Sequence, residues 1–265
     1  MQTILGHEGA IRISVFVGVL LTMVILETLL PRRSRGLTRT QRWPANLGIV
    51  VVDTLIARLV IPFPPVAVAL WAEETHTGLL NNLEVPLIPV VFGCVVFLDL
   101  AIYVQHVIFH KIPILWRLHR MHHADTDIDV TTGIRFHPIE IILSLLIKIA
   151  LVWALGIPAV AVILFEVILN ASAMFNHANM RLPLPIDRAL RRLIVTPDMH
   201  RVHHSWHRDE TDSNYGFSLS IWDRLFKTYR DQPRDGHDDM IIGLHDYREL
   251  KDHSLPGLLM IPFRH

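Results

Sequence analysis

Residues 106–123 read HVIFHKIPILWRLHRMHH, and residues 200–204 repeat the end of this stretch as HRVHH. The first stretch holds an HxxxH pair, His106 and His110, followed by an HxxHH triplet, and the second stretch is another HxxHH triplet. Residues three or four positions apart share one face of an α-helix. Both spacings therefore predict helices that present several imidazoles on the same side.

Each triplet is preceded by signals for the start of a helix. Pro113 suits the first turn of one helix, and Thr196 followed by Pro197 fits the N-cap and first residue of the other. Two further histidines stand alone, His137 in RFHP and His177 in FNHAN. Of the 17 histidines in the chain, ten thus fall between residues 106 and 204.

This concentration of histidine predicts a metal site. A solvent-exposed polar face would have Lys and Glu between the histidines, whereas the only charged residues within the two triplets are Arg120 and Arg201. Burying imidazoles without partners is costly. Imidazole ligands suit Zn, Cu, Fe or Ni. A structural zinc site needs four ligands, often with cysteine, so ten histidines fit two ions that share about five imidazoles each. The single cysteine, Cys94, excludes an intrachain disulfide and an iron–sulfur centre held by this chain alone.

The sequence around the histidines is that of a membrane protein. It is 51% hydrophobic and 19% charged, and a spanning helix needs about 20 mostly apolar residues. The second predicted span is the poorest, because it contains Asp53 and Arg58 and is broken by prolines. The last two spans are joined by a tight Gly-Ile-Pro turn; a buried helical hairpin is the alternative for this pair. The predicted spans are residues 11–30, 46–71, 88–110, 139–155 and 158–175.

Loop charge predicts the orientation in the membrane. Residues 31–42 carry five arginines and no acid, whereas residues 72–87 carry three glutamates and no Lys or Arg. The positive-inside rule then places residues 31–42 in the cytoplasm. Counting spans from there puts every histidine cluster on the cytoplasmic side. The predicted fold class is therefore all-α, an integral membrane helical bundle with a cytoplasmic, helical, histidine-rich metal-binding cap. The first span lacks a cleavage site and is expected to be a retained anchor.

The order HxxxH, HxxHH, lone histidine, HxxHH between hydrophobic hairpins resembles the fatty acid hydroxylase / sterol desaturase superfamily. The most specific stretches are TPDMHRVHH (196–204), NYG (214–216) and IWDRLFKTY (221–229). These are similar to the C-terminal part of the alkylglycerol monooxygenases. The resemblance covers roughly residues 90–230. It implies membrane-anchor helices in residues 1–87 and a di-iron hydroxylase-like domain in residues 88–265, within one fold unit overall.

The resemblance also implies the cofactor and its ligands. Members of this superfamily use two iron ions, O2 and external electrons to hydroxylate, desaturate or cleave lipids. Fatty acid hydroxylases of the superfamily carry another histidine four residues before the position of His177, where this chain has Ala173. We expect His137 to supply that missing ligand. The expected metal ligands are His106, His110, His119, His122, His123, His137, His177, His200, His203 and His204.

Polar residues below the metal ligands are expected to support them. Two series follow the steps i, i+4, i+7 and i+11, from Asp99 to His110 and from Glu166 to His177, so each predicts one helical stripe that enters the bilayer. Polar groups there are functional by default. We predict that Asp99, Glu166, Asn170 and Asn214 support the ligands, and that Lys148 pairs with Glu166 across the hairpin.

The expected function is hydroxylation of a lipid that arrives through the bilayer, with a separate electron donor such as a cytochrome, a ferredoxin or a reduced pterin. A desaturase of the same superfamily is the alternative. A metal transporter would place ligands near the midplane, a haem protein needs single axial histidines, and a zinc hydrolase would want a carboxylate base inside the motifs. The formal net charge of zero does not suggest binding to nucleic acid.

Overall fold

The computed structural model describes residues 6–264 and is helical, with no strand among these residues. Five helical segments are long and apolar enough to cross a membrane, and they confirm the predicted spans to within a few residues, apart from the second, which starts seven residues earlier. The chain is therefore a multi-pass membrane protein. The segments are α2 (Glu8–Leu29), α3 (Arg39–Val60) continued by α4 (Pro65–Glu74), α5 (Leu87–Lys111), α7 (Pro138–Leu155) and α8 (Ala159–Asn176).

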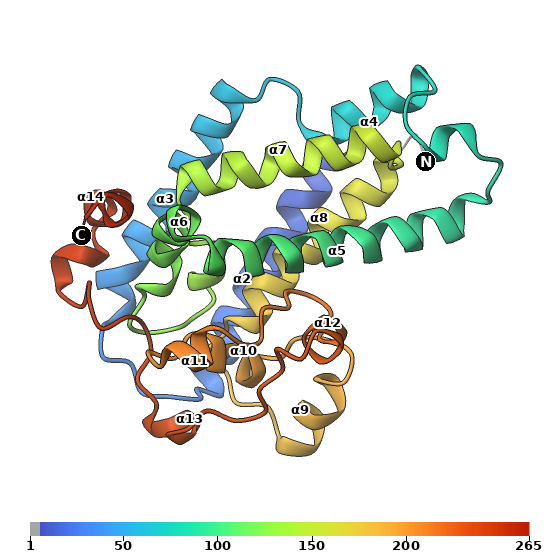
Figure 1. The fold of residues 1–265 in the computed structure, drawn as a ribbon. Coiled ribbons are helices and arrows are strands. Elements are labelled where there is room, and N and C mark those ends of the chain that lie inside the picture. The colour runs from blue at the N-terminus through green and yellow to red at the C-terminus, as the bar shows by residue number, and fades with distance from the viewer. Residues whose placement is uncertain (1–5, 265) are drawn as a thin grey trace.

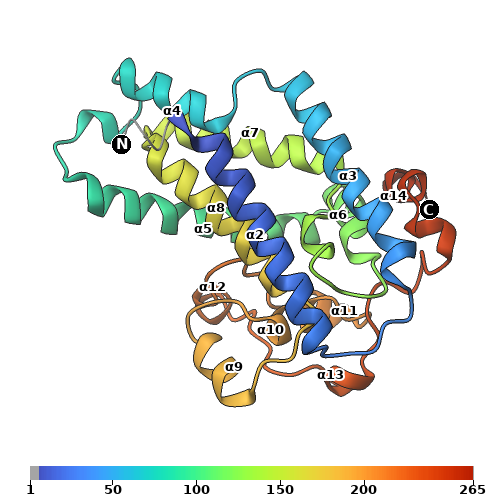
Figure 2. The ribbon, with the colours of Figure 1, turned by 180° about the vertical axis from the view of Figure 1, so that it is seen from behind.

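The second span is bent where its prolines lie. Residues 61–64 separate α3 from α4, and Pro65 is the first residue of α4. Proline has no N–H to continue the backbone ladder but fits the first turn of a new helix. Consequently α4 turns away from α3 (Figures 1 and 2) and packs on α7 and α8.

Helix α8 lies at the centre of the bundle, with α2 and α5 against it, while α3 and α4 pack on α7. The predicted tight turn joins α7 to α8. Gly156 ends α7 with a φ of 67°, which favours glycine. A Cβ at this position would also lie 2.9 Å from the carbonyl oxygen of Thr77.

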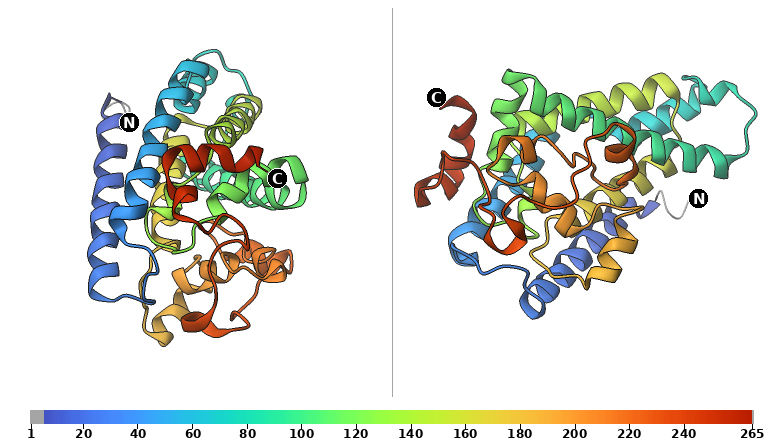
Figure 3. Two further views of the ribbon diagram at one scale, coloured as in Figure 1. Left: turned by 90° about the vertical axis from the view of Figure 1, so that its left-hand side faces the viewer. Right: turned by 60° about the horizontal axis from the view of Figure 1, so that its bottom comes forward.

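The remaining helices form a cap at one end of the bundle, where α5 and α8 end and α7 begins (Figures 1 and 3). All histidine motifs belong to this end, as predicted, and α2 begins at the other end. The cytoplasmic location of the cap and the division at residue 87 remain predictions. The cap contains α6 (Pro113–His123), α9 (Leu184–Leu190), α10 (Pro197–His203), α11 (Arg208–Thr211), α12 (Ile221–Leu225), α13 (Gly236–Asp239) and α14 (Leu255–Met260).

The arginine-rich loop that follows α2 connects the bundle to the cap, because its arginines bind residues of the cap. Arg33 donates to the carbonyl oxygens of Asp238 at 2.8 Å and Met240 at 2.5 Å. Arg32 pairs with Asp198 at 3.4 Å, next to the second histidine triplet. Arginine presents several donors in a rigid fork, so this short loop can hold distant segments of the cap together.

The predicted pair between α7 and α8 is present. Lys148 Nζ lies 2.7 Å from Glu166 Oε1, and Arg12 of α2 lies 2.9 Å from Glu166 Oε2. The Glu166 side chain is 4% exposed, whereas that of Arg12 is 36% exposed. One buried carboxylate thus compensates two cations inside the membrane-spanning region.

Replacing Glu166 with leucine is expected to lower the free energy of unfolding by about 3–5 kcal/mol, because a buried charge loses its partner. Lys148→Leu is expected to cost less, since Glu166 keeps Arg12. Thermal unfolding of both variants in one detergent tests this order. A Tm for Glu166→Leu at or above that of Lys148→Leu would contradict it.

Candidate metal centre

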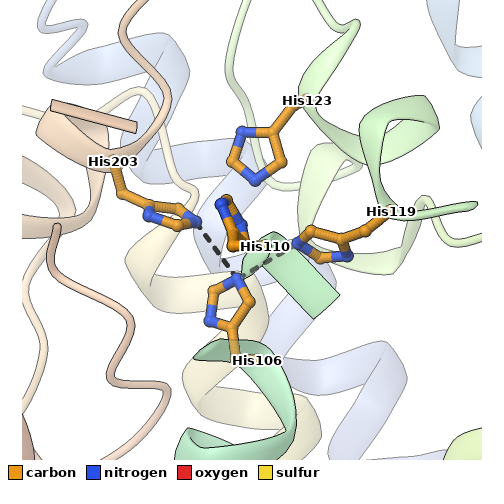
Figure 4. Close-up of side chains that lie close together, drawn as sticks. All are labelled: His106, His110, His119, His123 and His203. Carbon is orange, nitrogen blue, oxygen red and sulfur yellow. Dashed lines mark hydrogen bonds between the residues drawn. The ribbon is translucent and has the colours of Figure 1, made fainter. Parts of the chain in front are cut away.

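Nine of the ten predicted ligands lie together in two buried clusters, and the possible ligand nitrogens within each cluster lie within 4.8 Å of one another. Figure 4 shows the larger cluster, whose side chains converge from α5, α6 and α10. The five-histidine cluster consists of His106, His110, His119, His123 and His203. The four-histidine cluster consists of His122, His177, His200 and His204.

Each HxxHH triplet contributes to both clusters. In an α-helix, residue i+4 is rotated by about 40° from residue i, whereas residue i+3 is rotated by about 60° in the opposite direction. The i and i+4 histidines of a triplet therefore share a cluster, and the i+3 histidine belongs to the other. His119 and His123 join the five-histidine cluster while His122 joins the four-histidine cluster. His200 and His204 are separated from His203 in the same way.

The outer nitrogens of five ligands face hydrogen-bond acceptors. His119 Nδ1 lies 2.7 Å from the carboxylate of Glu140. The other four face backbone carbonyl oxygens, and neither kind of acceptor can donate a proton. Each of these Nδ1 atoms therefore carries the hydrogen. The carbonyl partners are Tyr215 for His106, Arg135 for His122, Ala173 for His177 and Ser213 for His203.

With the hydrogen on Nδ1, each Nε2 presents a lone pair to the centre of its cluster. His106 Nε2 lies 3.1 Å from both His119 Nε2 and His203 Nε2, the pairs joined by dashed lines in Figure 4. His177 Nε2 lies 3.1 Å from both His122 Nε2 and His200 Nε2. Lone pairs at this separation repel unless a cation lies between them.

The remaining Nε2 atoms lead to the same conclusion. Those of His110, His123 and His204 are buried and have no hydrogen-bond partner among the described residues, which is costly for a polar atom. Two ligands at right angles and ~2.1 Å from one ion lie ~3.0 Å apart, close to the observed spacing. The residues present therefore fit one metal ion in each cluster.

Burial also keeps the imidazoles outside the spans neutral. It lowers the pKa of His177 to about 4, although the hydrogen bond to Ala173 opposes this. A metal ligand must be a neutral imidazole, so these side chains are in the required form at neutral pH. Burial, together with neighbouring imidazoles, also lowers the pKa well below the ordinary value for His122, His123, His200, His203 and His204.

His137 does not join either cluster, so the expected tenth ligand is not brought to the site. It is the N-cap of α7, where its Nδ1 accepts a hydrogen bond from the Ile139 backbone N–H at 3.3 Å. Pro138 begins α7 directly after it, and a residue before proline is held in extended backbone. The position of Ala173 consequently has no substitute histidine.

The four residues expected to support the ligands hold other parts of the fold. Asp99 accepts hydrogen bonds from Trp222 Nε1 at 2.8 Å and the Leu219 backbone N–H at 3.2 Å. Glu166 pairs with the two cations described above, and Asn170 donates to its carbonyl oxygen. Asn214 donates to the carbonyl oxygen of Met199 in α10 at 2.8 Å. Only Asn214 acts near the ligands, because it fixes the helix that carries the second triplet.

Sequence reasoning missed Glu140, the one carboxylate among the described residues that is hydrogen-bonded to a clustered histidine; Asp212 lies 3.4 Å from His110 Nδ1 without a hydrogen bond. Glu140 lies in the first turn of α7, and its side chain is 7% exposed. An acidic residue in an apolar span was the available signal, since such residues are functional by default. The other four partners of the histidine Nδ1 atoms are backbone carbonyl oxygens. Every residue type has such an oxygen, so the sequence does not show which of them contact the histidines.

Replacing Glu140 with glutamine is expected to lower metal affinity about 10–100-fold, the usual effect of losing an outer partner of a metal-bound histidine. Asp99→Asn is the matched control, because Asp99 has no contact with a clustered histidine. Metal retained per chain after dialysis against a weak chelator measures both variants. Equal retention in the two would show that Glu140 has no role in orienting His119.

The bilayer side of the clusters is apolar. Phe136 stacks on His122 with ring centroids 4.6 Å apart, and the Phe217 ring lies 5.1 Å from that of His106. Both rings pack in the membrane core with residues such as Ile102 and Ala173. The packing beside the clusters on this side is therefore apolar.

Comparisons with known proteins place this site in a family. The sequence model of the fatty acid hydroxylase family matches residues 91–228, just over half of the chain and all nine clustered histidines. No solved structure matches the chain at a significant level.

Curated relatives include the ornithine lipid hydroxylase of Rhizobium tropici, 30% identical over 154 residues, which are 58% of this chain and 45% of that protein. The alkylglycerol monooxygenase of Homo sapiens is 30% identical over 131 residues, 49% of this chain and 28% of that protein. That of Caenorhabditis elegans is 27% identical over 151 residues, 57% of this chain and 28% of that protein. The matched stretch thus spans less than half the length of these relatives.

Proposed function

The chain belongs to the fatty acid hydroxylase family, and from this premise we propose that it is a membrane-bound oxygenase that uses two iron ions and O2 to hydroxylate a C–H bond of a lipid. The observation that carries the proposal is the convergence of nine buried histidines in two clusters, in which five Nε2 atoms present lone pairs because their Nδ1 atoms carry the hydrogen. The proposed ligands are these nine histidines, five for one ion and four for the other.

Iron both suits imidazole ligands and has the redox chemistry that a hydroxylase needs. Imidazole also suits zinc, copper and nickel, but zinc has no redox chemistry. When bound, iron supplies the redox chemistry by which O2 oxidises an unactivated C–H bond. A hydroxylase requires such chemistry, whereas a metal carrier would need ligands along a path through the midplane.

The protein's own residues orient the ligands and exclude water. Glu140 and the four carbonyl oxygens hold the imidazole rings in the tautomer that presents Nε2. Phe136 and Phe217 close the clusters from the membrane side with apolar rings. Glu140 is directed at His119 Nδ1 and not at the converging Nε2 atoms, which argues against its use as the base of a zinc hydrolase.

A lipid substrate is supported by this apolar side and by the names of the relatives, an ornithine lipid hydroxylase and alkylglycerol monooxygenases. We propose that the clusters face the cytoplasm, because residues 31–42, which carry five arginines in the loop and the first turn of α3, lie at the same end of the bundle. Electrons would come from a separate donor, such as a cytochrome, a ferredoxin or a reduced pterin.

Lipid profiling tests the proposal. Cells that express the wild-type chain under 18O2 are expected to accumulate a lipid that is heavier by one labelled oxygen atom, and cells that express His203→Ala are not. A lipid that loses two hydrogens and gains no label would instead identify a desaturase. Identical lipids in both cultures, with both proteins folded and present, would contradict the proposed function.

A further inference from the structure

Residues 181–193 and 219–228 form one surface of the cap, called here the α9–α12 face. Backbone contacts join its two segments. The Ser220 N–H donates to the Leu193 carbonyl oxygen at 3.1 Å, and Arg224 donates to that of Arg191 at 2.7 Å. These bonds join the residues that follow α9 to the start of α12, and both helices belong to the cap in Figures 1 and 2.

Large apolar side chains project from this face. Six of them are between 49% and 71% exposed, which is a dense group for the surface of a cap that would otherwise contact water. They are Leu184, Ile186, Leu193, Ile221, Leu225 and Phe226.

On the α9–α12 face the acidic residues are buried, whereas the basic residues are mostly exposed. Both acids of the two segments are buried, Asp187 at 2% exposure and Asp223 at 0%. At its edge, Asp231 is already paired with Arg191 at 3.0 Å. The exposed charged residues of the two segments are all basic, namely Arg181, Arg188, Arg192, Arg224 and Lys227.

The α9–α12 face contacts the membrane-spanning helix α5 at residues well before the end of that helix. Asp99 is the central residue of α5, about 18 Å along the helix axis from Lys111. Trp222 of α12 donates to Asp99 at 2.8 Å, and Tyr103 is hydrogen-bonded to Thr228 at 2.8 Å. Phe226 stacks on Tyr103 with ring centroids 5.4 Å apart. These contacts hold α12 beside the middle of α5, one of the membrane-spanning helices.

We propose that the α9–α12 face inserts into the membrane leaflet on the metal-centre side and binds anionic lipid headgroups. Apolar side chains bordered by Lys and Arg are the composition of segments that lie in the interface plane. Exposed basic residues near the surface attract anionic lipids. The inference depends on the spans and the cap contacts, and not on the metal or the reaction.

A soluble acidic electron donor is the other partner that basic residues could attract. The contacts with Asp99 and Tyr103 favour lipid, because they place α12 beside the middle of a membrane-spanning helix instead of at the end of that helix. The part of the cap around α11 is mixed in charge instead of basic, since the exposed Asp209 pairs there with Arg230 at 2.8 Å and Arg234 at 3.0 Å.

Fluorescent labelling of the whole chain tests the proposal. Cys94 is the single cysteine, so Leu225→Cys and Asp209→Cys in a Cys94→Ala background each give one accessible thiol for an NBD label. The proteins are reconstituted in phosphatidylcholine, alone or mixed with phosphatidylglycerol, with a nitroxide on the lipid near the headgroup. We expect blue-shifted emission and severalfold stronger quenching at position 225 than at position 209, increased by phosphatidylglycerol.

The triple variant Arg188→Gln, Arg192→Gln and Lys227→Gln separates the two parts of the proposal. It is expected to keep the quenching at position 225 in pure phosphatidylcholine and to lose the increase caused by phosphatidylglycerol. An increase that survives in the triple variant would overturn the binding of anionic headgroups. Equal, water-like emission at positions 225 and 209, or protection of position 225 only by an added acidic protein, would overturn insertion.

Discussion

Replacing His204 with alanine is expected to remove one of the two proposed metal ions and to lower product formation by more than ~100-fold, the upper end of what losing only an outer partner costs. Both ring nitrogens of His204 are buried without a hydrogen-bond partner. The substitution therefore breaks no hydrogen bond of a side chain within the protein, and its effect on metal content reports on ligation. Elemental analysis of the purified chain is expected to fall from two ions to one.

His137→Asn is the matched control for this experiment. Its histidine lies close in sequence to the first triplet but outside both clusters, and asparagine preserves an N-cap on α7. We expect two ions per chain and unchanged product formation. Loss of metal in His137→Asn, or two ions retained in His204→Ala, would contradict the assignment of ligands to clusters.

Replacing Arg42 with leucine is expected to lower the free energy of unfolding by about 3–5 kcal/mol, a large part of the 5–15 kcal/mol typical of a folded domain. Arg42 of α3 is fully buried. It donates two hydrogen bonds to Asp125, at 2.8 and 2.6 Å, and one to Asp129 at 2.7 Å. Without it, the two buried carboxylates keep Arg135, whose Nη1 lies 3.4 Å from Asp125, and neutral donors on Trp43, Thr131 and Thr132.

The same variant is expected to lose metal as well as stability. Asp125 follows the first triplet after one residue, and the carbonyl oxygen of Arg135 orients His122 at 3.1 Å. Thermal unfolding and metal content are compared with Arg58→Leu, which removes an exposed arginine from the same helix. Equal stability of the two variants would show that the buried pairing of Arg42 contributes nothing.

The pH dependence of this network has a defined sign. Burial acts to raise the pKa of Asp125, but Arg42 and Arg135 outweigh it and hold the pKa below its ordinary value. Its contribution to stability is therefore complete above the ordinary aspartate pKa and is lost only as the pH falls below that value. In Arg42→Leu the native pKa of Asp125 rises, so the stability lost on acidification is expected to be smaller than in the wild type, which pH-dependent unfolding can measure.

The sequence also placed the chemistry at one end of the bundle, and this could be read without any tertiary contact. Loop charge and the order of the spans already put residues 106–123, 177 and 200–204 together. The pairing of Lys148 with Glu166 followed from equal distances to the turn at residue 157. Supports for the ligands could not be read in this way, because backbone carbonyls such as those of Tyr215 and Ser213 come from a loop whose path depends on the whole cap.

The spans and the helix starts at Pro113 and Pro197 were determined by the sequence alone, because each depends on composition or spacing within a single helix. The sequence also singled out the nine histidines that the structure brings into two clusters. Only the tertiary structure decided which histidines share a cluster, that His137 serves as a cap, and that Asp99 holds the α9–α12 face while Glu140 holds His119. Those outcomes depend on where a side chain points relative to helices far away in the chain. Local periodicity sets a direction around one helix axis, but the packing of the bundle sets what lies in that direction.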